Sequence, residues 1–240
     1  MNRPDLHGSS LLAGASLKPD PMRLATDGAE RIESIALPVL DPIIDVLAPQ
    51  FRDRPGLRLH GVAGLADLLA PPGIIAQTVA RIAGRAVRPV RAILFDKTPA
   101  TNWSLAWHQD RTICARERRD VAGFGPWTVK AGLLHVAPPF ALLAQMVTIR
   151  IHLDDVPPDN APLLIAPGSH RFGLVQEDRI EAVVAQCGVH ACTALAGDIW
   201  IYATPILHAS DAAAMPRRRR VLQVDYAGFD LPGGLRWSGI

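Results

Sequence analysis

Hydrophobic and polar residues follow a helical period in the first part of the chain. Residues 72–83 place their apolar side chains on one stripe and Gly84 follows as a C-terminal stop, so we predict a helix there. Residues 65–69 predict a shorter helix that ends before a pair of prolines. Residues 30–48 also have helical spacing, although two prolines within them disfavour one uninterrupted helix.

The period changes to two near residue 87. Residues 87–95 alternate Val, Ile and Phe with other residues, which is typical of a strand. Turns rich in Gly, Pro and Asp separate the segments that follow. Further strands are predicted at residues 105–111, 133–136, 146–153, 163–166, 198–202, 207–210 and 221–227. Short strands after leading helices predict a mainly β fold, with helices outside a closed or two-sheet core.

The length of 240 residues suits a single domain of this class. We expect residues 87–240 to form the β core. Residues 1–86 are expected to form an N-terminal arm and helical support within the same domain. Residues 1–30 mix Gly, Ser, Pro and charged residues without a period, which is typical of a loosely ordered arm or cover.

Composition narrows the functional classes. The apolar fraction of 49% and charged fraction of 20% are those of a globular protein, and the net charge of +2 gives no reason to expect a nucleic-acid partner. Three cysteines form no disulfide framework and favour a reducing compartment. We find neither a signal peptide nor an apolar run of the ~20 residues that a spanning helix needs. We therefore expect a cytoplasmic protein without a membrane partner.

The segment Trp107-His108-Gln109-Asp110 carries the clearest chemical signal. Alternate residues of a strand share a face, so His108 and Asp110 are expected to project together. An imidazole and a carboxylate make two-thirds of a facial triad for non-haem Fe(II), and His208 on a later predicted strand offers the third ligand. A His-x-Asp pair also arises by chance. A second cluster of cysteine and histidine at residues 187–192 lacks the spacing of a zinc site.

Arg219 follows His208 by eleven positions, inside a run of four arginines that enters a predicted strand. An arginine that points into a β core needs an anion, because an unpaired buried charge is costly. If iron is bound, the expected anion is the distal carboxylate of 2-oxoglutarate, and Ser210 offers a hydroxyl on the same face as His208. The alternative, a nucleic-acid patch or targeting signal, is disfavoured because no aromatic residues are interleaved with the run.

These features resemble the phytanoyl-CoA dioxygenase family of Fe(II)/2-oxoglutarate oxygenases from about residue 90 to the C-terminus. The motifs that carry the resemblance are Phe95-Asp96-Lys97-Thr98, Asn102-Trp103, Trp107-His108-Gln109-Asp110, Gly125-Pro126-Trp127, Leu153-Asp154-Asp155, Pro167-Gly168-Ser169-His170-Arg171, Gly197-Asp198, Leu207-His208-Ala209-Ser210 and the arginine strand. The resemblance implies a double-stranded β-helix, the jelly-roll core of cupin-like proteins.

The resemblance also implies a set of site residues. His108, Asp110 and His208 match the iron ligands, and Arg219 and Ser210 match the positions that hold the distal carboxylate of 2-oxoglutarate. Three further residues are expected near the cosubstrate: Gln109, Trp127 and Lys97. For Lys97 the alternative is a solvated lysine at a strand end. Four residues are candidates for lining the substrate pocket: Trp103, Trp107, His135 and Asn160.

The implied enzyme uses Fe(II), 2-oxoglutarate and O2 to hydroxylate an unactivated C–H bond of a small molecule, releasing succinate and CO2. Halogenating relatives lack the carboxylate at the position of Asp110, so its presence favours hydroxylation; desaturation and ring closure stay open. Two other functions are alternatives: a cupin-like metal enzyme that does not use 2-oxoglutarate, and a binding protein that has lost turnover. The sequence leaves the substrate and the oligomeric state open.

Overall fold

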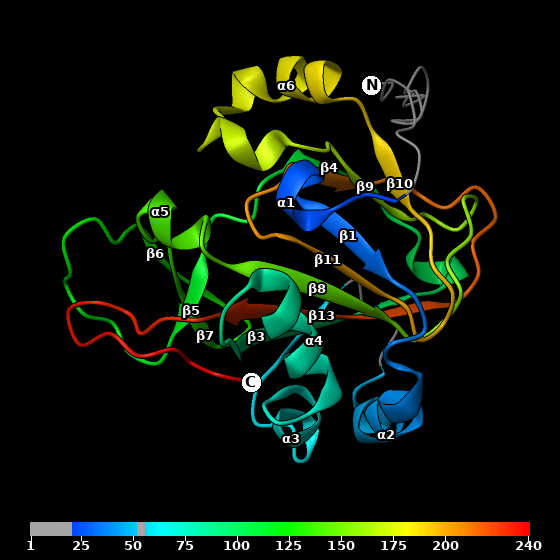
Figure 1. Ribbon diagram of the computed structural model, residues 1–240, viewed down its shortest axis with the longest axis horizontal. Coiled ribbons are helices and arrows are strands. Elements are labelled where there is room, and N and C mark those ends of the chain that lie inside the picture. The colour runs from blue at the N-terminus through cyan, green and yellow to red at the C-terminus, as the bar shows by residue number, and fades with distance from the viewer. Residues whose placement is uncertain (1–20, 52–55) are drawn as a thin grey trace, which may run out of the picture.

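The computed structural model describes residues 21–51 and 56–240, so most of the expected N-terminal arm lies outside the described residues. The strands form three antiparallel sheets (Figure 1). The six-stranded sheet has the order β1 (Ala29–Ile32), β11 (Ile199–Ala203), β8 (Val147–His152), β13 (Arg219–Ala227), β3 (Arg88–Lys97) and β2 (Leu57–Leu59). The four-stranded sheet has the order β10 (His190–Cys192), β9 (Leu163–Ile165), β12 (His208–Ser210) and β4 (Leu105–His108). The third contains β5 (Ile113–Ala115), β7 (Leu133–Val136) and β6 (Trp127–Lys130).

Helices cover the outer faces of the two larger sheets. The α-helices are α1 (Leu24–Asp27), α2 (Leu37–Leu47), α3 (Leu65–Leu69), α4 (Ile74–Ala83), α5 (Phe140–Leu143) and α6 (Ile180–Cys187). Single 3-10 turns occur at Ala48–Gln50, Pro99–Thr101, Ser169–Phe172 and Glu177–Arg179. Figure 1 shows α2, α3 and α4 beneath the six-stranded sheet and α6 above the four-stranded one. Among these described helices, none has the length and apolar character that crossing a membrane requires.

The alternation along β13 explains how the six-stranded sheet is buried on both faces. Leu222, Val224 and Tyr226 pack into the core cluster that α2, α3 and α4 share with the sheet. The intervening side chains, which include Gln223 and Asp225, point to the opposite face, because successive residues of a strand alternate. That inner face meets the four-stranded sheet through a second apolar cluster. The two sheets thus form the jelly-roll core that the sequence predicts, with polar side chains gathered inside it.

Several predicted elements agree with the structure. The two predicted helices of the first part correspond to α3 and α4, and Gly84 ends α4 in the left-handed conformation at φ 67°. The predicted strands from residue 87 onward correspond to β3, β4, β7, β8, β9, β11, β12 and β13. Gly84 takes this role because a glycine adopts positive φ without the steric cost of a Cβ.

The helical prediction for residues 30–48 is wrong at its start. Residues 29–32 form β1, which pairs antiparallel with β11, and the helix begins only at Leu37. Four other strands, β2, β5, β6 and β10, are absent from the prediction. All five have only three or four residues, so alternation gives only a weak signal for them. Pairing with longer neighbours stabilises them, and that contact cannot be read from local sequence.

Candidate metal centre and its cavity

Two histidines are brought together by strand pairing. In the register between β12 and β4, His208 lies opposite His108, and the two ring centroids are 4.2 Å apart. The Nδ1 atom of His108 lies 2.8 Å from the carbonyl oxygen of Ala106, and that of His208 lies 2.9 Å from the carbonyl oxygen of Ile206. Because a carbonyl only accepts, both Nδ1 atoms carry the proton and both Nε2 atoms keep a free lone pair.

Asp110 completes the group from a position two residues beyond the end of β4. Its Oδ2 accepts hydrogen bonds from Arg91 Nη2 at 3.1 Å and from Gln223 Nε2 at 3.4 Å, which leaves Oδ1 for another partner. One ligand atom from each of Asp110, His108 and His208 lies within 4.8 Å of the other two. Within residues 21–51 and 56–240, no other group of three or more such side chains comes this close.

The protonation states of the three side chains suit a divalent metal ion. Burial, with the charge of His108, lowers the pKa of His208 to about 4, so its imidazole is neutral at pH 7. Burial alone raises the pKa of Asp110, but Arg91 and the two histidines outweigh it, so the pKa lies below its usual value. Two nitrogen donors and one ionised carboxylate are the ligands of an open-sided iron site. The residues present therefore fit Fe(II).

Arg91 holds the carboxylate of Asp110 from behind. Its Nε donates to Asp225 Oδ2 at 2.6 Å, and Thr148 donates to the other oxygen of Asp225 at 3.0 Å. Burial lowers the pKa of Arg91, but the charges of Asp225 and Asp110 more than offset this and keep it a permanent cation. The sequence reasoning missed Arg91 and Asp225. Their signal is a charged residue at an alternate position of an otherwise apolar strand.

The three candidate ligands open onto a cavity of about 360 Å³ between the two larger sheets. Its walls include three of the five residues expected at the cosubstrate, namely Arg219, Ser210 and Lys97, together with Trp103. Its other lining residues were not predicted: Gly56, Arg58, Ile93, Phe95, Leu105, Arg150, Leu163, Ala209 and Gln223.

Arg219 is 2% exposed and reaches into this cavity. Its Nη1 donates to the carbonyl oxygen of Ala161 at 2.7 Å, while its Nε is buried without a partner. Burial and the nearby charge of Arg150 lower its pKa to about 9. Across the described part of the chain, no carboxylate forms an ion pair with Arg219. The guanidinium is therefore available to an anionic ligand.

Lys97 also faces the cavity and is not a solvated lysine, because it is 4% exposed. Its Nζ donates to the carbonyl oxygen of Trp103 at 2.7 Å and to Ser210 Oγ at 3.3 Å. It also lies 4.1 Å from the centre of the Trp103 ring. Burial and the charges of Arg219 and Arg150 lower its pKa to about 7.

Two expected neighbours of the cosubstrate lie elsewhere. The side chain of Gln109 is fixed by two distant segments. Its Nε2 donates to the carbonyl oxygens of Gly173 and Pro205, and its Oε1 accepts from the amide of Val175. Trp127 lies on β6 and packs against a cluster of the third sheet. Neither lines the cavity, so this geometry gives no support to a cosubstrate-binding role for them.

Three of the four substrate-pocket candidates are also absent from the cavity wall. Trp107 packs against the cluster beneath α6 on the outer face of the four-stranded sheet. His135 is fully buried, with its Nε2 3.4 Å from Cys114 Sγ. Asn160 accepts the backbone N–H of Arg217 at 3.1 Å. Of the four candidates, only Trp103 lines the cavity.

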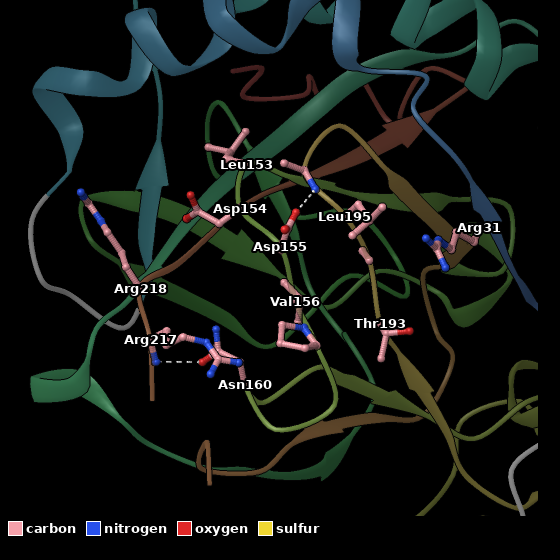
Figure 2. A pocket seen from close by; sticks show the side chains of 13 residues that line it. Arg31, Leu153, Asp154, Asp155, Val156, Asn160, Thr193, Leu195, Arg217 and Arg218 are labelled. Atoms are coloured by element: carbon pink, nitrogen blue, oxygen red, sulfur yellow. Dashed lines mark hydrogen bonds between the residues drawn. The ribbon is translucent and has the colours of Figure 1, made fainter. Parts of the chain in front are cut away.

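Asn160 belongs to a second, larger and more open hollow of about 860 Å³ (Figure 2). Figure 2 shows Arg217 and Arg218 on one side of it and Arg31 on the other. These arginines are paired with Asp159, Asp96 and Asp198, respectively. None of the three candidate metal ligands lines this hollow. Its charges are satisfied within the protein, so we assign the chemistry to the smaller cavity.

Comparison with known proteins identifies a matching family and solved structures with the same fold. The profile of the family described as Phytanoyl-CoA dioxygenase (PhyH) matches residues 48–221. A search of curated proteins finds no match.

Solved structures with the same fold include three proteins. AviO1 from Streptomyces viridochromogenes Tue57 has a TM-score of 0.59 at 22% identity, covering 88% of this chain and 93% of AviO1. EctD from S. alaskensis, solved with 2-oxoglutarate and 5-hydroxyectoine, has a TM-score of 0.61 at 18% identity over 94% of this chain and 87% of EctD. HygX from Streptomyces hygroscopicus, solved with nickel, 2-oxoglutarate and hygromycin B, has a TM-score of 0.55 at 16% identity over 85% and 84%. At these identities the likeness establishes the fold.

Proposed function

The chain belongs to the phytanoyl-CoA dioxygenase family of non-haem iron enzymes that use 2-oxoglutarate, and from this premise we propose that it hydroxylates an unactivated C–H bond of a small molecule. The proposed iron ligands are His108, Asp110 and His208. The observation that carries the proposal is that these three side chains share one cavity with Arg219, a buried arginine that has no carboxylate partner among the described residues.

We assign Arg219 and Ser210 to the distal carboxylate of 2-oxoglutarate. An arginine matches a carboxylate with two parallel hydrogen bonds, and a ligand carboxylate would satisfy the buried Nε that lacks a partner. Ser210 lies two residues after His208 on β12, so both side chains project to the same face. A dicarboxylate with one end at Arg219 therefore directs its other end toward the three candidate ligands.

The protein's own residues would position the reactants and limit access of water. When held by the three ligands, iron(II) supplies the redox chemistry by which O2 and 2-oxoglutarate yield succinate, CO2 and a hydroxylated product. Arg91 fixes one oxygen of Asp110 so that the other faces the metal position. Ile93, Phe95 and Leu163 give the cavity an apolar wall against which a C–H bond can pack.

The small-molecule character of the substrate is supported by the solved relatives. Two of them were solved as complexes with small molecules: 5-hydroxyectoine in EctD and hygromycin B in HygX. The cavity of about 360 Å³ in this chain is also of small-molecule size. These ligands indicate only the size class of the substrate.

The function is tested by measuring succinate. Purified protein supplied with Fe(II), 2-oxoglutarate and a fractionated metabolite extract is expected to form succinate only when O2 is present. Mass spectrometry should then find one extract component that gains a single oxygen atom in step with succinate. Succinate formation that does not depend on O2, or its absence from every fraction, would refute the proposed reaction.

Arg219→Met is expected to raise the KM for 2-oxoglutarate by roughly 30- to 1,000-fold, equivalent to about 2–4 kcal/mol of lost binding. The buried guanidinium is the charge that we pair with the distal carboxylate, and methionine keeps most of the apolar stem of the side chain without its charge. Steady-state kinetics with varied 2-oxoglutarate measure this effect.

Arg217→Met is the matched control, because Arg217 belongs to the same arginine run but is half-exposed and paired with Asp159. It should leave the KM for 2-oxoglutarate within about twofold of the unmodified protein. If both variants behave alike, the anchor has been assigned to the wrong residue.

Binding of 2-oxoglutarate is expected to weaken as the pH rises above 7. The pKa of Lys97 is about 7 without the ligand, and an anion bound beside it favours the ammonium form and raises that pKa. Below pH 7 the charge is already present. Above pH 7 binding must take up a proton, so the affinity falls, by up to about tenfold per pH unit.

Anaerobic titration calorimetry from pH 6 to about pH 8.5 measures this dependence. Lys97→Met should flatten the pH profile, whereas Lys130→Met, which alters an exposed lysine on β6, should preserve it. A steep profile that persists without Lys97 would show that another group takes up the proton.

A further inference from the structure

The cavity carries more positive charge than the proposed metal and cosubstrate can balance. Four cationic side chains line it, and Asp110 is its only lining carboxylate in the described part of the chain. A divalent metal ion adds two positive charges and 2-oxoglutarate removes two. Three positive charges then remain, or two if Lys97 is neutral. The four cations are Arg58, Lys97, Arg150 and Arg219.

Of the four cations, Arg58 is the one that we do not expect 2-oxoglutarate to neutralise. It lies on β2 opposite Ile93, whose other neighbour across the sheet is Gln223. Gln223 donates to Asp110, so the row of paired residues Arg58, Ile93 and Gln223 lies beside the metal position. Arg219 lies opposite Lys97 in the register of the sheet. Lys97 is four residues beyond Ile93 on β3, which is about 13 Å along the strand. Arg58 therefore lies beside the reacting end of the cavity and away from the distal-carboxylate anchor.

Among the described residues, no side chain compensates the charge of Arg58. Its Nε is buried and has no hydrogen-bond partner within this part of the chain. Among residues 21–51 and 56–240, no carboxylate forms an ion pair with it. Arg150 also has a buried Nε without a partner, but its Nη1 donates to Gln223 at 3.0 Å and its guanidinium lies 4.9 Å from the centre of the Phe95 ring. An arginine in this state is stabilised by an anion that enters the cavity, because leaving a partly desolvated charge unpaired is costly.

We propose that the substrate is a small carboxylic acid whose carboxylate binds Arg58 and whose apolar part packs against Ile93 and Phe95 beside the metal position. Arg58 lines the same cavity as those two side chains, so one molecule can reach all three. The cavity of about 360 Å³ also has to hold 2-oxoglutarate, which favours a small acid over a bulky thioester. This inference rests on the proposed function, since it assigns the remaining charge only after metal and cosubstrate are in place.

Calorimetry under nitrogen tests the inference by binding and not by turnover. The protein is loaded with Fe(II) and saturating 2-oxoglutarate, and hexanoate and phenylacetate are compared with hexanamide and phenylacetamide. Each acid is expected to bind about tenfold or more tightly than its amide. Arg58→Gln should weaken binding of the acids by about 30-fold and leave binding of the amides unchanged. Arg58→Lys should restore most of the preference.

Arg81→Gln is the matched control, because Arg81 is exposed on α4, on the opposite face of the sheet. It should keep the preference for acids, and thermal unfolding should show that both glutamine variants are folded. Equal binding of acid and amide, or no binding of either acid at millimolar concentration, overturns the proposal. Tighter binding of hexyl phosphate than of hexanoate overturns the assignment to a carboxylate.

The acids are also titrated into protein that carries Fe(II) alone. Acid binding that is seen there but lost in the presence of 2-oxoglutarate would place the acid at Arg219, and this result also overturns the proposal. The proposed function and the proposed substrate class can be refuted separately. Absence of O2-dependent succinate refutes the proposed function whatever the acids do. A preference for amides under nitrogen refutes only the substrate class and leaves the succinate assay untouched.

Discussion

Asp110→Ala is expected to reduce O2-dependent succinate formation by about 10³-fold or more, equivalent to about 4 kcal/mol in activation free energy. The substitution removes the only anionic member of the candidate ligand set, so the two histidines would bind the metal more weakly. It also leaves Arg91 and Gln223 without the oxygen to which both donate. The loss should appear in succinate formation and in the stoichiometry of Fe(II) binding measured by equilibrium dialysis.

Asp120→Asn provides the comparison for this prediction, because Asp120 is an exposed carboxylate in the loop before β6. It should retain normal succinate formation and normal Fe(II) binding. Circular dichroism distinguishes loss of the metal from loss of the fold in the alanine variant. Turnover of a folded Asp110→Ala protein at the normal rate would remove Asp110 from the ligand set.

Arg91→Met is expected to lower the free energy of unfolding by about 3–5 kcal/mol at pH 8. Arg91 is 5% exposed and forms ion pairs with Asp225 at 2.6 Å and with Asp110 at 3.1 Å. Removing it leaves the carboxylate of Asp225 buried without a cation. Urea denaturation measures the loss, and Arg81→Met on the surface of α4 should change stability by no more than about 0.5 kcal/mol.

The cost of Arg91→Met should be smaller at low pH. Burial, opposed by Arg91, already raises the pKa of Asp225 above its ordinary value, and loss of Arg91 raises it further. When the pKa of a carboxyl group is higher in the folded state than in the unfolded state, the free energy of unfolding is highest below the unfolded pKa. Its contribution to stability is lost as the pH rises toward the folded pKa. The destabilisation should therefore grow from about pH 4 upward.

A second variant separates charge from packing at this position. Arg91→Met combined with Asp225→Leu removes the buried carboxylate together with its partner, so it should recover much of the lost stability and flatten the pH dependence. If the double variant is as unstable as Arg91→Met alone, the loss comes from the packing of Arg91 and not from the uncompensated charge.

The sequence was sufficient to predict that His108, Asp110, His208 and Arg219 would lie in one place. Alternation along a strand places the first two together, and a jelly roll brings distant strands side by side. In the structure His208 pairs directly with His108, and Arg219 begins β13 beside the same cavity. Asp110 lies beyond the end of its strand, so the turn geometry and not strict alternation determines its direction.

Adjacency in the chain does not imply adjacency in space around the metal centre. Gln109 lies between two candidate ligands, yet its amide is fixed by the loop at residues 173–175. Trp107 precedes His108 and projects to the opposite face of the sheet, beneath α6. The direction of a side chain near a strand end depends on its contacts with distant segments, which the local pattern does not contain.

The polar lining of the cavity was missed for a related reason. The residues of β8 alternate between apolar Val147, Ile149 and Ile151 and polar Thr148 and Arg150. This alternation usually predicts a polar face in water and an apolar face in the core. Here the apolar face lies under helices and the polar face lines the interior, so every residue of β8 is buried. The alternation of apolar and polar residues distinguishes the two faces of β8, but it does not show that both faces are buried.

The backbone bonds of the two histidines have a consequence for the thermodynamics of metal capture. Each imidazole is held by a carbonyl oxygen two residues earlier in its own segment, at Ala106 and Ile206. The rings therefore lose their rotational freedom when the chain folds and not when an ion arrives. Immobilising a side chain costs roughly 1 kcal/mol of entropy. For both rings this entropy is lost on folding, so metal binding does not have to include it and the two imidazole ligands are preorganised.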